Sequence, residues 1–159
     1  MSKKQTNDGL IANNRRAKFD YEITDTYEAG VMLVGSEVKS LRLSSVKLDD
    51  AHVQATSEDE LEIVNLHINE YNNANKLGGH KPKRARKLLL HRREINKIIS
   101  GLAKNGYTAI PLKMYFNEKG IVKLLIGLGK GQRTVDKRQN IKDREWKIEK
   151  QRAFKDYNK

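Results

Sequence analysis

The sequence predicts a protein that is mainly β with flanking helices: a small antiparallel Greek-key barrel of the oligonucleotide-binding type (OB-like). Five or six short apolar segments follow one another at close spacing, separated by turn-forming residues, which is typical of small barrels. One segment of the body has clear helical periodicity. With 159 residues, of which 37% are hydrophobic, the chain has room for one modest core and a tail.

The first strands follow a polar, basic lead-in. Residues 1–16 form this lead-in, which we expect to be flexible, and the barrel is predicted to span residues 17–131. Apolar and polar residues alternate in residues 19–24, as in a strand with one buried face. A second strand is expected in residues 27–34, where Gly30 would permit the bend or bulge that a barrel needs.

The middle of the chain predicts a hairpin followed by a long loop. Residues 37–42 form either a helical turn or an irregular link. Two strands, 51–56 and 61–68, flank the acidic turn at residues 57–60. Residues 69–83 are polar and rich in Asn and Gly. A loop of this length within a compact domain is either functional or disordered, and its basic end favours a function.

The body ends with a helix and two further strands. From residue 91, isoleucines and a leucine recur at helical spacing until Asn105-Gly106 supplies a stop. Strands are expected at residues 107–116 and 121–128, and Pro111 places an edge or a bulge in the first of them.

Residues 132–159 are predicted to form a basic tail. Residues 133–159 hold ten Lys or Arg and five Asp or Glu. The few large apolar side chains do not line up as a stripe that could dock on the core. We therefore expect a tail that is disordered when free and becomes helical on a partner.

The charge distribution points to RNA. The chain holds 32 Lys and Arg against 20 Asp and Glu, a formal net charge of +12, which suits a phosphate backbone. Residues 76–93 contain eight Lys or Arg and no carboxylate. Basic surfaces also serve solubility, but this clustering favours a polyanionic partner.

No catalytic chemistry is visible in the sequence. There is no cysteine, and the four histidines are scattered, so we expect no disulfide, metal or cofactor. Glycines at 127, 129 and 131 around Lys130 resemble a phosphate-binding loop but lack the Gly-Lys-Ser/Thr ending. We interpret this run as a flexible strand exit and keep Lys130 as an RNA contact. An enzyme is not expected.

The expected compartment is the cytoplasm. Residues 1–8 lack the apolar stretch of a secretory signal. No apolar run approaches the roughly 20 residues that span a bilayer, so no membrane partner is expected.

Several motifs, in order along essentially the whole chain, resemble the SsrA-binding protein (SmpB) family. They are EAGVMLVGSEVKSLR (28–42), HINEYNNAN (67–75), RARKLLLHRREI (84–95), DKR (136–138) and KDREW (142–146). The resemblance implies an OB-like body that binds the tRNA-like domain of transfer-messenger RNA and takes the place of a missing anticodon arm. It also implies delivery of that RNA to stalled bacterial ribosomes for trans-translation, which is ribosome rescue with peptide tagging.

The resemblance further implies which residues meet each partner, with a monomer as the acting species. The RNA face would comprise Asn14, Arg16, Tyr21, Glu28, Lys39, Arg42, His67, Tyr71, Asn75, His80, Arg84, Arg86, Leu89 and Lys123. Leu89 is either a contact or part of the supporting core. The tail would enter the ribosomal mRNA channel near the decoding centre and contact small-subunit rRNA. Its residues would be Asp136, Lys137, Arg138, Lys142, Arg144, Trp146, Lys147, Ile148, Lys150 and Arg152. Val135 stands where the family usually has Tyr or His, so it lacks the ring that a stacking contact needs.

Two other classes of function remain open. A different ribosomal or ribosome-associated RNA-binding protein would explain the charge and the barrel, but not the ordered set of motifs. An RNA-processing enzyme would need a catalytic constellation that the sequence does not show.

Overall fold

The computed structural model describes residues 9–71, 79–132 and 134–157, the last segment with side chains from residue 138 onward. Along the chain the elements are β1 (Leu10–Asn13), α1 (Ala17–Asp20), β2 (Tyr21–Val31), α2 (Gly35–Leu43), β3 (His52–Ala55), β4 (Leu61–Val64), β5 (Arg86–Leu89), α3 (Arg92–Leu102), β6 (Tyr107–Phe116), β7 (Val122–Gly131) and α4 (Thr134–Tyr157).

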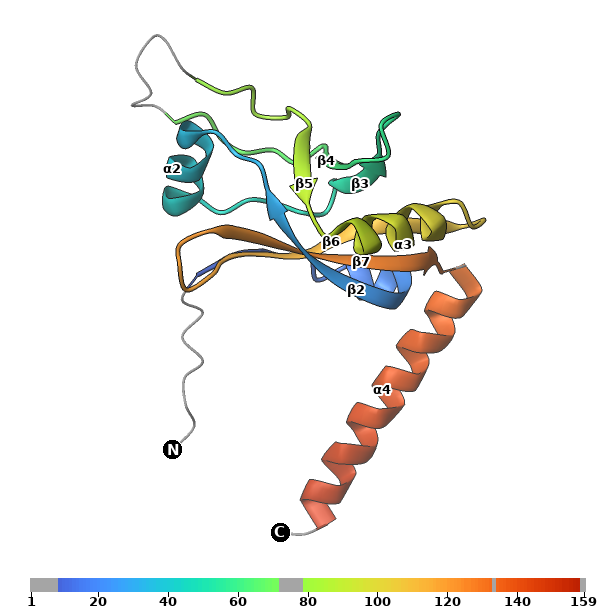
Figure 1. Ribbon diagram of the computed structural model, residues 1–159. Coiled ribbons are helices and arrows are strands. Elements are labelled where there is room, and N and C mark those ends of the chain that lie inside the picture. Colours follow the sequence, from blue (N-terminus) through green and yellow to red (C-terminus); the bar gives the residue numbers. More distant parts are fainter. Residues whose placement is uncertain (1–8, 72–78, 133, 158–159) are drawn as a thin grey trace.

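The strands form one antiparallel sheet that closes on itself. Its order is β1-β6-β3-β4-β5-β2-β7, and β7 also pairs with β6. The ring therefore runs β6-β3-β4-β5-β2-β7 and returns to β6. Strands β3, β4 and β5 are neighbours in chain order, but the strand before them, β2, lies beside β5 and not beside β3. This arrangement of four strands is a Greek key. The predicted OB-like barrel with flanking helices is confirmed (Figure 1).

Strand β6 changes partners at the bulge that Pro111 predicted. One edge pairs with β7, with a register shift between Pro111 and Lys113. The other edge pairs with β3 at Ala109 and with β1 from Lys113 onward. At this change of partner the Asn14 side chain donates a hydrogen bond to the Pro111 carbonyl at 3.1 Å. A proline fits here because it has no N–H to contribute to a ladder.

The core follows the alternation of the strands and one face of α3. Leu61, Ile63, Leu124 and Ile126 are fully buried, so alternate residues of β4 and β7 face inward. Helix α3 turns Ile98 toward the same core. The predicted hairpin, helix and last two strands are all present, with α3 ending at Leu102.

Three expectations about the body need correction. The two strands expected between residues 19 and 34 are one strand, β2, with a register shift between Ile23 and Asp25. The lead-in is shorter than predicted, because residues 10–13 pair with β6 as β1. A strand, β5, was not predicted in the basic run before α3. Of the two alternatives for residues 37–42, a helical turn or an irregular link, the helical one is confirmed, as α2.

The glycine run at the end of β7 is part of the sheet, not a flexible exit. At Gly129 a Cβ would lie 2.7 Å from the Glu22 carbonyl oxygen and 3.0 Å from the Ile23 side chain. These two residues belong to β2, next to its register shift. Glycine is required because the β2 backbone approaches β7 too closely for a side chain.

This close approach predicts a position-specific cost. Gly129→Ala should lower the free energy of unfolding by about 1–3 kcal/mol, because the β2 backbone must move to admit a methyl group. Gly131→Ala is the matched control, since a Cβ at Gly131 meets nothing within 4 Å. Urea unfolding of the two variants measures the difference, and equal stabilities would contradict the close-approach explanation.

Candidate nucleic-acid interface

Four residues on neighbouring strands stand directly opposite one another across the barrel wall. In order across β5, β2, β7 and β6 they are Leu89, Gly30, Lys123 and Tyr115, and we call them the outer row. Their chain neighbours Leu88, Ala29, Leu124 and Met114 are buried in the core. Because successive side chains of a strand point to opposite faces, the outer row points away from the core.

Leu89 lies at one end of the outer row, next to Gly30, which has no side chain. It is 49% exposed. A Cβ at Gly30 would lie 3.3 Å from the Leu89 Cβ, so Leu89 leans across the glycine. The structure thus places Leu89 on the surface rather than in the core, in the same row as Lys123 of the predicted RNA face.

A second row runs beside the first and carries Glu28. Across β2, β7 and β6 it consists of Glu28, Leu125 and Lys113. The Tyr115 hydroxyl donates a hydrogen bond to the Glu28 carboxylate. The Lys113 Nζ lies 5.6 Å from the centroid of the Tyr115 ring, a distance at which a cation is attracted to the ring. Cations, a carboxylate and an aromatic ring therefore share one sheet face.

Burial raises the pKa of Tyr115, and the hydrogen bond and charge of Glu28 raise it further, to about 12. The phenol therefore keeps its proton at neutral pH and remains a hydrogen-bond donor. Tyr115 and Lys113 were not among the predicted site residues. The alternation of residues in the last part of β6 could have placed Tyr115 and Lys113 on one face. That Tyr115 reaches Glu28, however, depends on the register of β2, β7 and β6.

Helix α2 begins four residues after β2 ends and is held in place by one buried carboxylate. Glu37 is 0% exposed. Its Oε1 accepts from Arg84 Nε and Arg86 Nε, both at 2.8 Å. Its Oε2 accepts from Arg84 Nη2 at 2.7 Å and from the Val34 backbone N–H at 3.0 Å. The last contact is the backward hydrogen bond of a capping box at the start of α2.

Arg86 is an interior cation, not a surface one. Its side chain is 0% exposed. Besides Glu37, its guanidinium donates to the Leu66 carbonyl at 2.7 Å and to the Pro82 carbonyl at 3.0 Å. The RNA contact predicted for Arg86 is therefore not available to this side chain. Its role is to tie the loop that precedes β5 to α2.

His80 is a second member of the predicted RNA face that lies inside, at 6% exposure. Its Nε2 lies 3.0 Å from the Ile68 carbonyl oxygen, which can only accept, so Nε2 carries the proton. In the neutral ring Nδ1 then accepts from the Ser36 hydroxyl at 2.9 Å. His80 thus joins the long loop to α2, as Arg86 does.

Burial opposes the charge of Glu37, but hydrogen bonds from Arg84, Val34 and Arg86 outweigh that effect and lower its pKa. Burial likewise lowers the pKa of Arg86, and the hydrogen bond and charge of Glu37 oppose that change. The carboxylate therefore stays ionised at neutral pH. Each group satisfies the other in a region that water does not reach.

The exposed side of this assembly carries several predicted contacts. Lys39 and Arg42 of α2 and His67 are exposed, and Arg84 is half-buried. The Lys39 Nζ lies 5.7 Å from the centroid of the Tyr71 ring. Asn75, also predicted, lies outside the described residues. The Glu37 network thus presents basic and aromatic groups at the end of β2 that carries the outer row.

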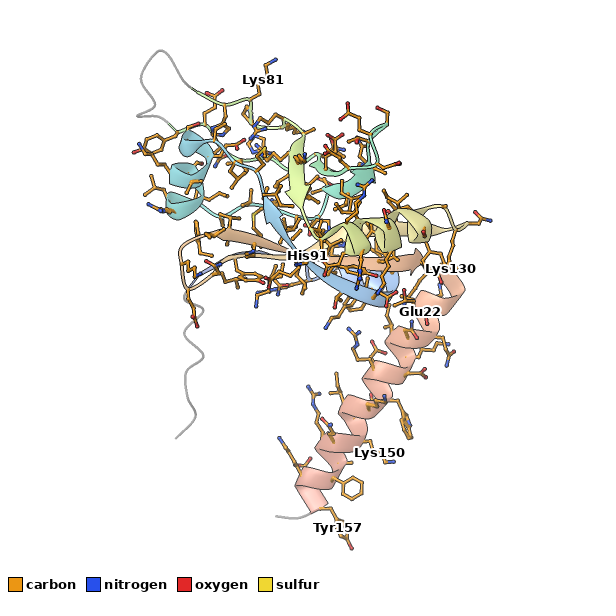
Figure 2. The ribbon with its side chains drawn as sticks, viewed as in Figure 1. Glu22, Lys81, His91, Lys130, Lys150 and Tyr157 are labelled. Atoms are coloured by element: carbon orange, nitrogen blue, oxygen red, sulfur yellow. The ribbon has the colours of Figure 1, made fainter. Side chains whose placement is uncertain are left out.

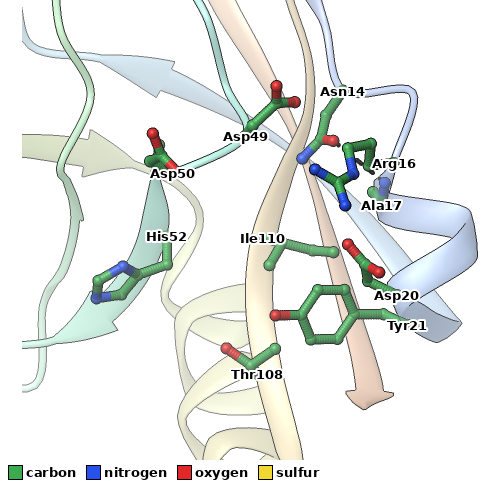
Figure 3. A pocket seen from close by; sticks show the side chains of 11 residues that line it. Asn14, Arg16, Ala17, Asp20, Tyr21, Asp49, Asp50, His52, Thr108 and Ile110 are labelled. Atoms are coloured by element: carbon green, nitrogen blue, oxygen red, sulfur yellow. Dashed lines mark hydrogen bonds between the residues drawn. The ribbon is translucent and has the colours of Figure 1, made fainter. Parts of the chain in front are cut away.

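A third predicted group lies at a separate cavity of about 340 Å³. Figure 3 shows Arg16 and Tyr21 at this cavity with Asp20 and, across from them, Asp49 and Asp50. Asn14 also lines the cavity, but its side chain serves the fold, since it accepts from the Ala17 backbone N–H at 3.1 Å as well as bonding Pro111. The three carboxylates make this cavity a poor phosphate site.

Lys130 is not grouped with the other predicted contacts. It pairs with Glu22 and Tyr107 near the end of β7, whereas Lys123 is near the start of the same strand. Figure 2 shows Lys130 and Glu22 close to the beginning of α4. Lys130 is exposed but faces a different part of the molecule from the outer row.

The tail forms a single helix that stands away from the barrel (Figure 1). The structure shows the helical form in the chain alone, so its coupling to a partner remains a prediction. All side chains from residue 138 to residue 157 are exposed, and Figure 2 shows them projecting along the helix. The side chains of Asp136 and Lys137 lie outside the described part.

Two contacts join the first half of α4 to the residues before it in the chain. The Arg144 guanidinium carbon lies 4.3 Å from the centroid of the Phe19 ring, and the Asn140 side chain donates to Gln132 at 3.1 Å. Further along, the Lys150 Nζ lies 5.0 Å from the Trp146 ring. The other predicted tail residues with described side chains, Arg138, Lys142, Lys147, Ile148 and Arg152, are exposed.

Residues 9–71, 79–132 and 134–157 contain neither a membrane-spanning helix nor a metal-binding cluster. No helix in these segments is long and apolar enough to cross a membrane. In the same segments the His, Asp and Glu side chains form no group of three or more that could hold a metal ion.

An OB-like barrel with a basic and aromatic outer sheet face and a charged helical tail defines a small nucleic-acid-binding β-barrel protein. A model of the SmpB protein family matches residues 11–156. The chain belongs to this family.

Individual relatives are similar over nearly the whole chain. The SsrA-binding protein of Maricaulis maris is 48% identical over 157 residues, covering 99% of each chain. That of a Wolbachia strain from Brugia malayi is 51% identical over 146 residues, covering 92% of this chain and 97% of its own. A solved chain described as "tmRNA-SmpB: a journey to the center of the bacterial ribosome" is 42% identical, with a TM-score of 0.64, covering 79% of this chain and 86% of that chain.

The hydrogen bonds that join Glu37 to Val34, Arg84 and Arg86 predict a large loss of stability for a conservative substitution. Glu37→Gln should lower the free energy of unfolding by about 3–5 kcal/mol, because it leaves Arg86 charged and buried without a counter-ion. Glu60→Gln is the control. Glu60 pairs with Lys87 at 2.7 Å on the surface, where an ion pair contributes about 0–1 kcal/mol.

The same network predicts a pH dependence. The pKa of Glu37 is lower in the folded than in the unfolded chain. The contribution of its charge to stability is therefore complete above the ordinary glutamate pKa of about 4.3, and it is lost as the pH falls through the pKa of the folded chain. The stability gap between the native chain and Glu37→Gln should narrow in acid. Urea unfolding at neutral and acidic pH checks this, and a constant gap would contradict it.

Proposed function

We propose that this chain binds the tRNA-like domain of transfer-messenger RNA and delivers this RNA to stalled bacterial ribosomes for trans-translation. The family match over residues 11–156 carries the proposal. The described geometry supports it, because Glu28, Leu89 and Lys123, three residues of the predicted RNA face, occupy adjoining rows on one sheet face.

The chemistry of that face suits folded RNA. Lys123, Lys113 and Lys39 would neutralise phosphates, while Glu28 would accept hydrogen bonds from RNA donors. RNA helices are recognised mostly through backbone shape and 2′-hydroxyls, which calls for such a mixture of cations and acceptors. The net charge of +12 adds long-range attraction.

The tail supplies the second half of the proposed function. Its exposed cations, such as Lys142, Lys147 and Arg152, would contact small-subunit rRNA along the mRNA channel and near the decoding centre. Because α4 makes few contacts with the barrel, it is free to make others. A vacant channel would then be the condition for rescue.

The proposed mode of action is binding, without catalysis or cofactor. One chain carries both the sheet face and the tail, so a monomer is the proposed working unit. Its proposed partners are the RNA and the ribosome, and the proposed compartment is the cytoplasm, where these partners act.

Sequencing the RNA that copurifies with the tagged full-length chain tests the proposal. A single discrete transfer-messenger RNA is the expected result. Recovery of ribosomal subunits in fixed ratio, without that RNA, would instead favour a ribosomal or other ribosome-associated protein.

Removing the tail should separate the two halves of the function. Deleting residues 133–159 should leave the melting temperature and the affinity for transfer-messenger RNA nearly unchanged, because the described tail side chains are exposed. Peptide tagging on stalled ribosomes should collapse, because the phosphate contacts of the tail are lost. Tagging at the full-length rate would show that the tail is dispensable and that the channel proposal is wrong.

A further inference from the structure

Tyr115 and Glu28 meet across a strand that separates them. Tyr115 belongs to β6 and Glu28 to β2, and β7 runs between the two. Tyr115 stands opposite Lys123, and Glu28 stands opposite Leu125, one row further along. The phenol therefore reaches diagonally over the outward face of β7 to donate to the Oε2 of Glu28.

We propose that Tyr115 is a positioning residue, which holds the Glu28 carboxylate ready to accept a hydrogen bond from a donor group of RNA, a 2′-hydroxyl or an exocyclic amine. The inference rests on the proposed function and adds a residue and a chemical class of contact to it.

The physical basis is the freedom that an exposed glutamate otherwise has. Glu28 is exposed, so an untethered side chain would sample several rotamers and lose that freedom on binding. The Tyr115 hydroxyl engages Oε2 and leaves Oε1 to the RNA. Lys113, 5.6 Å from the ring centroid, supports the ring in turn. The Glu28 side chain is thus already held in one orientation before RNA binds.

The charges of the neighbours favour a donor over a phosphate at Glu28. A carboxylate repels a phosphate, whereas the adjacent Lys123 and Lys113 attract one. The raised pKa of Tyr115 means that the phenol retains its proton at neutral pH and cannot become a second anion beside Glu28. RNA phosphates would lie along the lysines, with a donor group directed at the carboxylate.

The barrel offers a close control on the same strand. Tyr107 lies at the other end of β6 and is half-buried, as Tyr115 is. Its ring also has a lysine above it, with the Lys104 Nζ 5.8 Å from the centroid. Tyr107 stands opposite Lys130 rather than Lys123. Tyr107→Phe therefore removes a hydroxyl from a similar setting away from Glu28.

The test uses the full-length chain and the tRNA-like domain of transfer-messenger RNA as the probe. Tyr115→Phe should weaken binding about tenfold through the loss of an ordered charge-assisted hydrogen bond. Tyr107→Phe should bind as the native chain does. Native affinity in Tyr115→Phe would overturn the proposal.

A double-mutant cycle separates positioning from direct contact. Because Tyr115 is proposed to act through Glu28, the double variant Tyr115→Phe, Glu28→Gln should bind no more than about twofold more weakly than Glu28→Gln alone. Multiplied losses would mean that Tyr115 contacts RNA independently and would overturn the positioning role.

A readout without RNA distinguishes failure of this inference from failure of the proposed function. In the free protein, Glu28→Gln should shift the ¹³Cζ resonance of Tyr115 and leave that of Tyr107 in place. An unchanged Tyr115 resonance would overturn the inference by itself. A shifted Tyr115 resonance would show that Tyr115 and Glu28 interact in the free protein. If that chain nevertheless did not prefer transfer-messenger RNA over unrelated RNA, both the proposed function and the positioning role toward RNA would be overturned.

Discussion

The buried carboxylate of Glu37 holds together the α2 side of the candidate interface. It joins the first turn of α2 to Arg84 and Arg86, which lie 47 and 49 residues further along the chain. Burying these charges is costly, and it is tolerated because hydrogen bonds from two guanidinium groups and a backbone N–H satisfy the carboxylate. Arg86 also bonds the Leu66 and Pro82 carbonyls. The stretch between β4 and β5 is therefore attached to the body near both its ends.

The two parts of the proposed RNA face have different supports. The outer row rests on the register of four strands, and Gly30 lets Leu89 lie close against β2. The α2 side rests on Glu37 and His80, which hold the helix against the loop that bears His67. The basic residues of the motifs at 28–42 and 84–95 therefore have two roles. Arg86 holds the framework together from inside, while Lys39 and Arg42 remain at the surface for a partner.

Local patterns predicted much of the fold, and long-range pairing accounts for what they missed. The β3–β4 hairpin, α3 and the last two strands have turns and periodicity within a few residues of one another. Strands β1 and β5 are short and gain their stability from distant partners, so their own residues show little. Burial of Arg86 and His80 could not be predicted for the same reason, since Glu37 and Ser36, which bond them, lie 49 and 44 residues away in the chain. Tyr115 was missed because its role depends on the register of β2, β7 and β6.

RNA is proposed to lie on the face formed by the outer row and α2. Backbone amide chemical-shift mapping of the labelled full-length chain, titrated with the tRNA-like domain of transfer-messenger RNA, tests this placement. The largest changes are expected at Gly30, Tyr115, Lys123 and Lys39, with small changes at the acidic β3–β4 turn, residues 57–60. Changes centred on that turn, or on the cavity beside Asp49 and Asp50, with an unperturbed outer row, would contradict it.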